Sequence, residues 1–494
     1  MFKKILIANR GEIARRIMRT AREMEIQTVA VYSEADRLAP HVLESDQAVS
    51  IGPADPTESY LDIHKIIAAA EETGAEAIHP GYGFLAENPA LPEACEAAGI
   101  TFIGPPAGVI RDLGEKTKAR RIMQAAGAPL IPGMLTSCAE PGELAGQADK
   151  IGYPVMVKAS GGGGGKGMRV VEDAASLAEA CRQAMSEAGA AFGDPSIYLE
   201  KHLSGIRHVE VQVLADDRGN TVHLYERECS IQRRRQKIIE ETPSPALTPE
   251  LRRAMGRAAV TIARAAGYIN AGTVEFLLDS ENNFYFLEVN TRLQVEHAVT
   301  ELVCGLDLVR RQILIAAGHP LPFGQEDITQ RGHAIQCRIY AENPAAGFAP
   351  SPGAIGLYRE PTGPGVRVDS GVYQGIHVPM EYDPILARLV IWGEDREAAR
   401  MRMIAALSNY PILGVETNIA YLKEIMAHPA FASGETYTDF LDRHFAHWQP
   451  TFDNTDLACM ACVAHETTAS AVSTGATHPP VQATPWQALG NWRM

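Results

Sequence analysis

A glycine-dense segment bracketed by lysines is the strongest sign of chemistry in this 494-residue sequence. Residues 160–168 read SGGGGGKGM between the strand-like stretches YPVMVKA and MRVV, with Lys158 before the glycines and Lys166 after them. Glycines lose much entropy on ordering, so a run of them is expected where backbone N–H groups must approach phosphate oxygens closely. A flexible linker is the alternative, but the flanking strands and lysines argue against it. The segment predicts a hairpin lid over nucleotide phosphates.

Two better-known phosphate-binding patterns do not describe this loop. A Walker A loop requires Ser or Thr at the position that Gly167 occupies. A Rossmann fingerprint requires a helix directly after its glycines, whereas here a strand-like segment follows them. The hairpin lid is therefore the preferred interpretation.

Paired carboxylates on neighbouring strands are the second sign. Glu275 lies in GTVEFLL, and Glu288 and Asn290 lie in FYFLEVN, with the turn-like DSENN between the two segments. Such strands can bring Glu275 and Glu288 face to face, and Asn290 shares a face with Glu288 because it is two residues away. Hard oxygen ligands of this kind suit Mg²⁺. An exposed cross-strand pair is the alternative, but its like charges would repel.

Three further polar segments could line a site. In NTRLQVEH, residues Arg292, Gln294 and Glu296 would share one face of an extended strand, which offers a cation, an amide and a base, although a surface strand end is the plain alternative. The basic run 232–237 is either a solvated face or the lining of an anion site. Residues 79–84, HPGYGF, follow a strand, where open α/β sheets place binding loops.

The elements that must position these residues alternate in the first block of the chain. Apolar runs and helical periodicity predict strands at 3–9, 28–32, 75–79 and 100–103 and helices at 11–24, 60–72 and 91–98. This alternation predicts an α/β fold in which helices wrap a parallel sheet.

The rest of the chain is more varied. Predicted helices cover 115–126, 249–266, 395–407 and 415–427, and half-buried strands cover 207–214 and 221–225. From about residue 332 the chain becomes strand-rich with many Gly and Pro, and residues 447–494 form a low-charge tail.

Composition excludes several classes of protein. Hydrophobic residues make up 46% and charged residues 21%, so a sizeable core is expected and overall disorder is not. The net charge of -15 disfavours nucleic acid or an anionic membrane as partner. Eight scattered cysteines do not suggest a disulfide scaffold, and the lone pair Cys459 and Cys462 lacks the second pair of a zinc site. Without a signal segment or an apolar run of about 18 residues, a cytoplasmic protein is expected.

Over about residues 1–446 the chain resembles biotin carboxylase, an ATP-grasp ligase. The matching stretches are KILIANRGEIA, HPGYGFLAEN, FIGP, GEKTKAR, YPVMVKASGGGGGKGM, EKHL, RHVEVQV, ERECSIQRR, EFL, FLEVNTRLQVEHAVTE and YDPILARL. The resemblance implies an N-terminal doubly wound parallel sheet, a central ATP-grasp domain with a glycine-rich lid and a C-terminal strand-rich α+β domain. The implied bounds are 1–114, 115–331 with the lid at about 131–204, 332–446, and the tail at 447–494.

The resemblance also implies the reaction. ATP, bicarbonate and carrier-linked biotin would give ADP, phosphate and carboxybiotin through carboxyphosphate, with Mg²⁺ or Mn²⁺ bound. The implied partners are a biotin carboxyl carrier protein or biotinyl domain, a second copy of the chain in a homodimer, and a carboxyltransferase subunit. No AMKM biotin-attachment motif occurs, so a separate biotin carboxylase subunit is expected. The resemblance implies that it serves an acetyl-CoA or other acyl-CoA carboxylase in fatty acid biosynthesis.

Three alternatives stay open beside it. One is the subunit of a two-subunit pyruvate carboxylase, and another is an ATP-grasp carboxylate–amine ligase. A catalytically silent subunit is the third, but the candidate catalytic residues are all present in the sequence.

Site residues follow from the resemblance position by position. The phosphate contacts would be Lys116, Lys158, Gly164 and Gly165, and the adenine and ribose contacts Glu200, Lys201, Leu203 and His208. The metal ligands would be Glu275, Glu288 and Asn290. The bicarbonate site would comprise Lys237, Arg292, Gln294 and Val295, with Glu296 as the base. The biotin contacts would be Tyr82, Gly83 and Arg338. Family members often carry His where Arg235 stands, so the role of Arg235 is left open.

Overall fold

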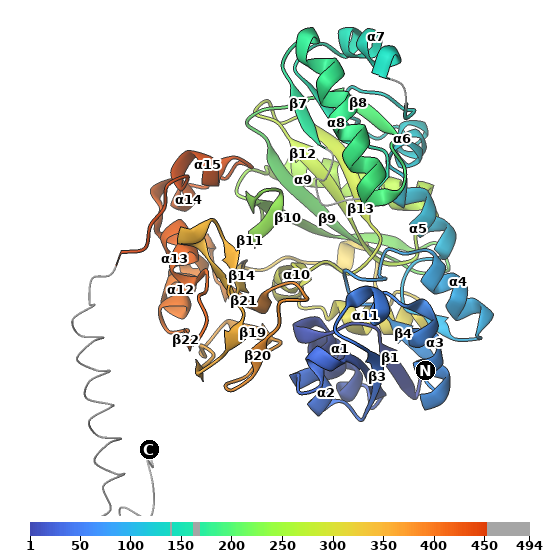
Figure 1. Cartoon of the computed structure of the whole chain (residues 1–494), viewed down its shortest axis with the longest axis vertical. Coiled ribbons are helices and arrows are strands. Elements are labelled where there is room, and N and C mark those ends of the chain that lie inside the picture. Colours follow the sequence, from blue (N-terminus) through green and yellow to red (C-terminus); the bar gives the residue numbers. More distant parts are fainter. Residues whose placement is uncertain (139–140, 162–167, 452–494) are drawn as a thin grey trace, which may run out of the picture. The chain divides into compact units, whose positions relative to one another are not determined.

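The first hundred residues of the computed structural model form a five-stranded parallel sheet with the strand order β3-β2-β1-β4-β5 (Figure 1). The structure describes residues 1–138, 141–161 and 168–451. The strands are β1 Lys4–Ile7, β2 Gln27–Ser33, β3 Gln47–Gly52, β4 Ala77–His79 and β5 Thr101–Phe102. The helices of this part are α1 Gly11–Glu23, α2 Pro40–Glu44, α3 Ile63–Thr73, α4 Ala90–Ala97 and α5 Ala107–Gly114. The predicted parallel α/β architecture is confirmed.

The central strand of this sheet shows why the sequence pattern was readable. Ile5, Leu6 and Ile7 are all fully buried, because helices cover both faces of a parallel sheet and its strands become continuous apolar runs. Helix α1 turns Ile13 and Ile17 towards the same core at helical spacing. The edge strand β3 was not predicted, since its QAVSIG sequence is mostly exposed and carries no apolar run.

An eight-stranded antiparallel sheet continues from the central into the C-terminal part, in the order β13-β12-β9-β10-β11-β14-β21-β19. Its strands are β9 Arg207–Ala215, β10 Thr221–Arg233, β11 Gln236–Thr242, β12 Asn270–Leu278, β13 Phe284–Asn290, β14 His333–Tyr340, β19 Val366–Ser370 and β21 Ile385–Gly393. Helices α6 Lys116–Ala125, α9 Pro249–Ala265, α10 His297–Cys304 and α11 Leu308–Ala316 accompany it. Since β11 pairs with β14, the backbone of the two parts is one hydrogen-bonded sheet.

The strand predicted at 207–214 exists as β9, but it is buried on both faces and not on one. Its alternation is real, because Val209, Val211 and Val213 pack into a core with α9. The polar face is buried as well: Glu210 and Gln212 have no exposed surface. A period-two pattern therefore marked a strand between an apolar core and a polar interior, not one between core and solvent.

The glycine loop joins two paired strands, as predicted. Strands β6 Val155–Ala159 and β7 Arg169–Val171 are antiparallel neighbours in a three-stranded sheet of order β7-β6-β8, where β8 is Ile197–Lys201. Helices α7 Pro141–Ile151 and α8 Ala174–Phe192 belong to the same part (Figure 1). The predicted glycine contacts Gly164 and Gly165 lie outside the described residues.

Short strands and helices complete the C-terminal part. The strands are β15 Glu342–Asn343, β16 Ala349–Pro350, β17 Gly353–Ala354, β18 Leu357–Tyr358, β20 His377–Val378 and β22 Ile412–Leu413. The helices are α12 Arg396–Ser408, α13 Ile419–Ala427, α14 Pro429–Ala432 and α15 Phe440–His444. Residues Met1–Trp448 form one unit and Gln449–Met494 a second.

Two expectations concern cysteines and membranes. None of the six cysteines within the described ranges forms a disulfide, and Cys459 and Cys462 lie outside those ranges. In the part of the chain that the structure describes, no helix has the length and apolar character that a membrane crossing requires.

Candidate active site

The middle of the eight-stranded sheet holds a cluster of buried charges. Adjacent strands carry Glu275 on β12, Glu210 on β9, Arg227 on β10, Lys237 on β11 and Arg338 on β14. Strand register places Glu210 directly between Glu275 and Arg227. Since buried charges are costly unless paired, such a concentration on five neighbouring strands is a candidate functional centre.

Lys237 connects three carboxylates at this centre. Its Nζ donates to Glu210 Oε2 at 2.5 Å, Glu275 Oε1 at 2.7 Å and Glu296 Oε1 at 2.8 Å. Burial lowers the pKa of Lys237, but the three carboxylates outweigh burial and hold the pKa well above its usual value. The ammonium group is therefore charged at neutral pH and lies where an anionic substrate would meet both a cation and a base.

The predicted metal ligands Glu275 and Glu288 are register partners on β12 and β13, as the sequence suggested. Burial and the neighbouring Glu275 raise the pKa of Glu288, while Lys116 opposes them. Burial also raises the pKa of Glu275, but Lys237 and His208 outweigh it and keep that pKa well below its usual value. Glu275 is buried and Glu288 is partly exposed. Two carboxylates that repel each other fit a divalent cation, which would neutralise both.

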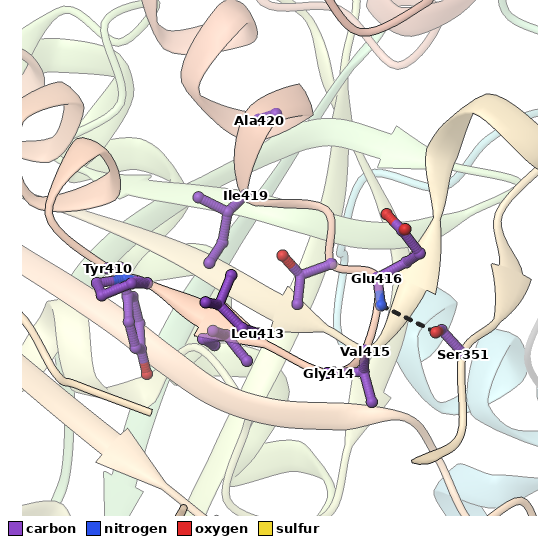
Figure 2. A pocket seen from close by; sticks show the side chains of 11 residues that line it. Ser351, Tyr410, Leu413, Gly414, Val415, Glu416, Ile419 and Ala420 are labelled. Atoms are coloured by element: carbon purple, nitrogen blue, oxygen red, sulfur yellow. Dashed lines mark hydrogen bonds between the residues drawn. The ribbon is translucent and has the colours of Figure 1, made fainter. Parts of the chain in front are cut away.

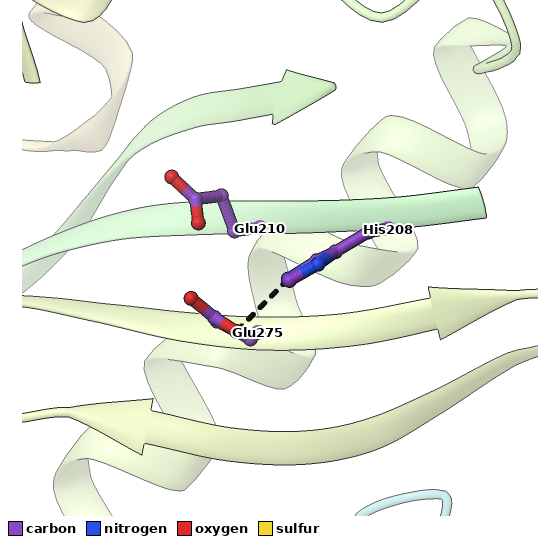
Figure 3. Close-up of side chains that lie close together, drawn as sticks. All are labelled: His208, Glu210 and Glu275. Carbon is purple, nitrogen blue, oxygen red and sulfur yellow. Dashed lines mark ion pairs between the residues drawn. The ribbon is translucent and has the colours of Figure 1, made fainter. Parts of the chain in front are cut away.

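Neighbouring groups support the same fit. His208 Nε2 lies 2.9 Å from Glu275 Oε2, and Glu210, on the same strand as His208, lies close to both (Figure 3). Asn290 is buried, and its Oδ1, the atom that could bind a cation, accepts from Arg292 Nη2 at 3.2 Å. Its Nδ2 has no hydrogen-bond partner among the described residues. Glu210 was not predicted from the sequence, although a glutamate amid the valines of RHVEVQVL was a usable signal.

The segment 291–296 is a loop rather than the predicted extended strand. Strand β13 ends at Asn290 and α10 begins at His297, so the backbone turns between them and His297 N donates to Gln294 O. The three predicted side chains still converge on the site through different contacts. Arg292 Nη1 donates to Gln294 Oε1 at 2.7 Å, and Gln294 Nε2 donates to Glu275 Oε1 at 3.1 Å.

Glu296 lies fully buried between two cations. Lys237 contacts Oε1, and Arg338 Nη2 donates to Oε2 at 3.2 Å. Burial raises its pKa, but Lys237 and Arg338 outweigh burial and hold the pKa well below its usual value. The carboxylate is therefore ionised at neutral pH, which is the state that a general base requires.

The HPGYGF loop lies beside the C-terminal strands. Gly81 and Gly83 have φ values of +64° and +68°, which glycine adopts without strain. Asn9 Nδ2 fixes the loop by donating to the carbonyl oxygens of Pro80 and Tyr82 at 2.8 Å and 2.7 Å. The guanidinium of Arg388 lies 5.9 Å from the Tyr82 ring centroid, and Arg388 is the register partner of Arg338. The structure thus brings Tyr82 near the strand that carries Arg338.

The lid strands contribute a separate charged group. Glu200 on β8 pairs with Lys158 on β6 and accepts from Arg120 Nη1 at 2.5 Å, so its carboxylate is already engaged. Lys201 Nζ donates to the carbonyl oxygens of residues 152 and 153, so it does not point at the charge cluster. Leu203 follows β8 and is partly exposed.

Lys116 lies between the lid and the carboxylate pair in electrostatic terms. Burial and Lys158 lower the pKa of Lys116 while Glu288 raises it. Lys116 thus connects the lid and the carboxylate pair electrostatically.

Val295 and Arg120 contact residues near the site through specific hydrogen bonds. Val295 accepts a hydrogen bond at its carbonyl oxygen from Arg388 Nη1 at 2.7 Å. Arg120, which no sequence pattern singled out, is buried on α6 and orients Glu200.

A hollow of about 640 Å³ lies elsewhere, on the C-terminal part (Figure 2). Tyr410, Leu413 and Ile419 line it with Glu416, whose backbone N–H donates to Ser351 Oγ at 2.9 Å. Glu416 is its single charged lining residue, so the hollow lacks the opposed charges of the sheet centre. The charge cluster is the candidate active site.

Comparisons with known proteins agree with this site. The family model "Carbamoyl-phosphate synthase L chain, ATP binding domain" matches residues 115–323. The models "Biotin carboxylase, N-terminal domain" and "Biotin carboxylase C-terminal domain" match residues 1–110 and 336–443. An ATP-binding domain with opposed carboxylates and a strand–loop–strand lid defines an ATP-dependent ligase. The chain belongs to the biotin carboxylase family.

Relatives within the family are parts of carboxylases with different names. A pyruvate carboxylase subunit of Methanothermobacter thermautotrophicus is 56% identical over 444 residues, which cover 90% of each protein. The alpha subunit of the mitochondrial methylcrotonoyl-CoA carboxylase of Arabidopsis thaliana is 52% identical over 90% of this chain, which spans 60% of that relative.

A solved structure shares the fold closely. The biotin carboxylase domain dimer of the Hydrogenobacter thermophilus 2-oxoglutarate carboxylase, in complex with MgADP, ADP and bicarbonate, has a TM-score of 0.89 and 46% identity. The match covers 92% of this chain and all of that one. Its likeness extends across the parallel sheet, the ATP-binding part and the strand-rich C-terminal part.

Proposed function

We propose that this chain carboxylates biotin held on a carrier protein or domain, with ATP, Mg²⁺ and bicarbonate as co-substrates and cofactor. The observation that carries the proposal is the contact of Lys237 and Arg338 with opposite oxygens of Glu296, next to the Glu275–Glu288 pair. A buried base between two cations suits the activation of a small anion such as bicarbonate.

The nucleotide would lie between the lid and the carboxylate pair. Glu275, Glu288 and Asn290 would hold Mg²⁺, which when bound neutralises charge on the phosphates. Lys116 and Lys158 would contact the phosphate oxygens, with Gly164 and Gly165 of the lid over them. His208 would face the ribose, and the backbone at Glu200, Lys201 and Leu203 the adenine, because the carboxylate and the ammonium of that segment are already engaged.

Bicarbonate would bind beside Lys237, with Arg292, Gln294 and the backbone of Val295 around it. Glu296 would accept its proton, so that the bicarbonate oxygen can attack the γ-phosphate, displace ADP and form carboxyphosphate. Carboxyphosphate would then release CO2 beside biotin and leave phosphate. The fixed guanidinium of Arg338 would stabilise negative charge on the ureido oxygen of biotin, while Tyr82 and Gly83 line that side.

We further propose an acyl-CoA carboxylase as the setting, in which a carboxyltransferase passes the carboxyl group to acetyl-CoA or another acyl-CoA. The methylcrotonoyl-CoA relative supports this choice, and the pyruvate carboxylase relative supports pyruvate as the second candidate. The dimeric Hydrogenobacter structure supports a homodimer. Isolating the partner that co-purifies with the chain, then testing acetyl-CoA, propionyl-CoA and pyruvate as acceptors, decides between them.

Biotin-dependent ATP hydrolysis tests the chemistry. With free biotin and bicarbonate, Glu296→Ala and Arg338→Ala should each lower turnover about 10²–10⁴-fold, because each removes a group acting at the reacting atoms. ATP should still bind, as equilibrium dialysis would show. Glu288→Lys should instead impair ATP use itself. Wild-type-like turnover in both alanine variants, or no stimulation of the wild type by biotin, would overturn the mechanism.

A further inference from the structure

A second buried carboxylate holds Arg338, and the proposed reaction gives it no role. Glu240 lies on β11 and has no exposed surface. Arg338 Nε donates to Glu240 Oε1 at 2.6 Å, and Gln336 Nε2 donates to Glu240 Oε2 at 3.0 Å. Both donors come from β14, where Gln336 is the register partner of Glu240. The carboxylate is therefore held in one orientation by two donors from the next strand.

This contact occupies one particular edge of the guanidinium. An arginine offers five N–H donors in a rigid planar fork. Glu240 takes Nε, while Nη2 reaches Glu296 Oε2 at a longer 3.2 Å. Without Glu240, Arg338 would be free to turn its fork onto Glu296 and form a bidentate pair. That pair would occupy both the group that meets biotin and the base.

The electrostatic surroundings make Glu240 dependent on Arg338. Burial raises the pKa of Glu240 to about 7, and Arg338 opposes burial. Glu296 also raises that pKa and Lys237 on the same strand lowers it. Burial is the largest cause that raises the pKa of the Cys229 and Cys337 thiols and of the Tyr340 hydroxyl, and Glu240 in turn contributes to each rise. Because Glu240 is buried close to Glu296, its charged form depends on the donors Arg338 and Gln336.

We propose that Glu240 is a positioning residue, which fixes the Arg338 guanidinium for the ureido oxygen of biotin and keeps Glu296 free to accept the bicarbonate proton. The inference rests on the proposed function, in which Arg338 contacts biotin. It adds the residue that sets the orientation of that contact.

The next residue along the strand provides a matched control. Glu241 is 2% exposed and points to the opposite face of β11. Its carboxylate pairs with His333 Nε2 at 2.7 Å and Arg396 Nε at 2.7 Å, two residues that lie apart from Arg338 on the other side of the strand. Glu240→Gln and Glu241→Gln therefore make the same substitution at similarly buried sites on one strand, and they differ in contact with Arg338.

The test is steady-state biotin-dependent ATP hydrolysis by the full chain, with free biotin varied against saturating ATP and bicarbonate. Glu240→Gln should raise the KM for biotin about tenfold, the size of a weakened hydrogen bond to a charged group, and leave the KM for ATP within about twofold. Glu241→Gln should leave the KM for biotin within about twofold, although it lowers thermal stability. Where Glu240→Gln does not fold, Glu240→Asp keeps the charge, lengthens the contact and should raise the same KM.

A double variant assigns the effect to Arg338. Arg338→Lys keeps a charge but loses the fork, so adding Glu240→Gln to it should change the KM for biotin by less than about twofold. An undiminished effect in that background, or equal effects of Glu240→Gln and Glu241→Gln, would overturn the inference. If Arg338→Lys alone leaves biotin kinetics unchanged, the proposed biotin role of Arg338 fails instead, so the two failures are distinguishable.

Discussion

The two large sheets of this protein are buried in different ways. In the parallel sheet, β1 presents Ile5, Leu6 and Ile7 to apolar cores on both faces. In the eight-stranded sheet, β9 presents valines to one core while Glu210 and Gln212 face a polar interior with equally little exposure. The first sheet gains stability from apolar burial, whereas the second gives up some of that stability to hold charges in place.

The contrast explains how the site keeps its geometry. Arg227 has no exposed surface, and its guanidinium donates to Glu210, Gln212, Thr300 and Thr273 at 2.5–3.0 Å. Glu210 in turn holds Lys237. Such a network is arranged before any ligand arrives, so little reorganisation is needed when charge develops during reaction. Four substitutions test the contrast, in order of expected effect.

Arg227→Met should have the largest effect on stability. It removes the guanidinium beside buried Glu210, which then shares the single ammonium of Lys237 with Glu275 and Glu296. The free energy of unfolding should therefore fall by about 3–5 kcal/mol. Urea denaturation followed by circular dichroism measures it. Adding Glu210→Gln should restore much of the loss without restoring turnover. A stable single variant would mean that the polar interior admits water and is not a dry network.

Ile17→Ala tests the parallel sheet. The side chain is fully buried on α1, and its truncation should lower the free energy of unfolding by about 3 kcal/mol through lost burial and a cavity. Turnover per folded molecule should stay near wild type, because Ile17 packs in an apolar core rather than in the charge cluster. A large fall in kcat at a temperature where the variant is fully folded would contradict the view that the parallel sheet supports stability while the eight-stranded sheet holds the site.

Glu228→Gln tests the cost of burying charge. Burial raises the pKa of Glu228 to about 7, although Arg207, Ser230 and Ser244 oppose it. The folded state therefore holds this proton more tightly than the unfolded state, so stability is greatest at low pH and falls as pH rises from about 4.5 to 7. The wild type should lose about 2–3 kcal/mol more than the variant between about pH 4.5 and 8. Parallel curves of unfolding free energy against pH for the two proteins would refute this assignment.

Arg253→Ala should have the smallest effect. Arg253 pairs with Glu250 on α9 at 2.9 Å, and both side chains are largely exposed. Exposed pairs of this spacing contribute little, so the free energy of unfolding should change by less than about 0.5 kcal/mol. A loss comparable to that of Arg227→Met would show that burial does not set the scale of charge effects here.

Much of the parallel sheet could be predicted because local patterns match its environment. Its apolar runs and helical periodicity located β1, β2, β4 and β5, but the exposed edge strand β3 carries no such pattern. In the candidate site, the face-to-face carboxylates Glu275 and Glu288 followed from two strands and a short turn. The loop at 291–296 did not follow, because its alternation looked extended while the start of α10 forces a turn.

Short sequence motifs were enough to recognise the family and to predict most element types, and they carry the proposals for the residues that bind phosphate, metal and bicarbonate. Tertiary packing was needed to show that Glu210, Arg227 and Glu240 share the interior of one sheet with Lys237, Glu296 and Arg338. The hydrogen-bonded pairs among them lie up to 98 residues apart in the sequence. The strand residues meet through the way whole strands pair, which no short segment encodes.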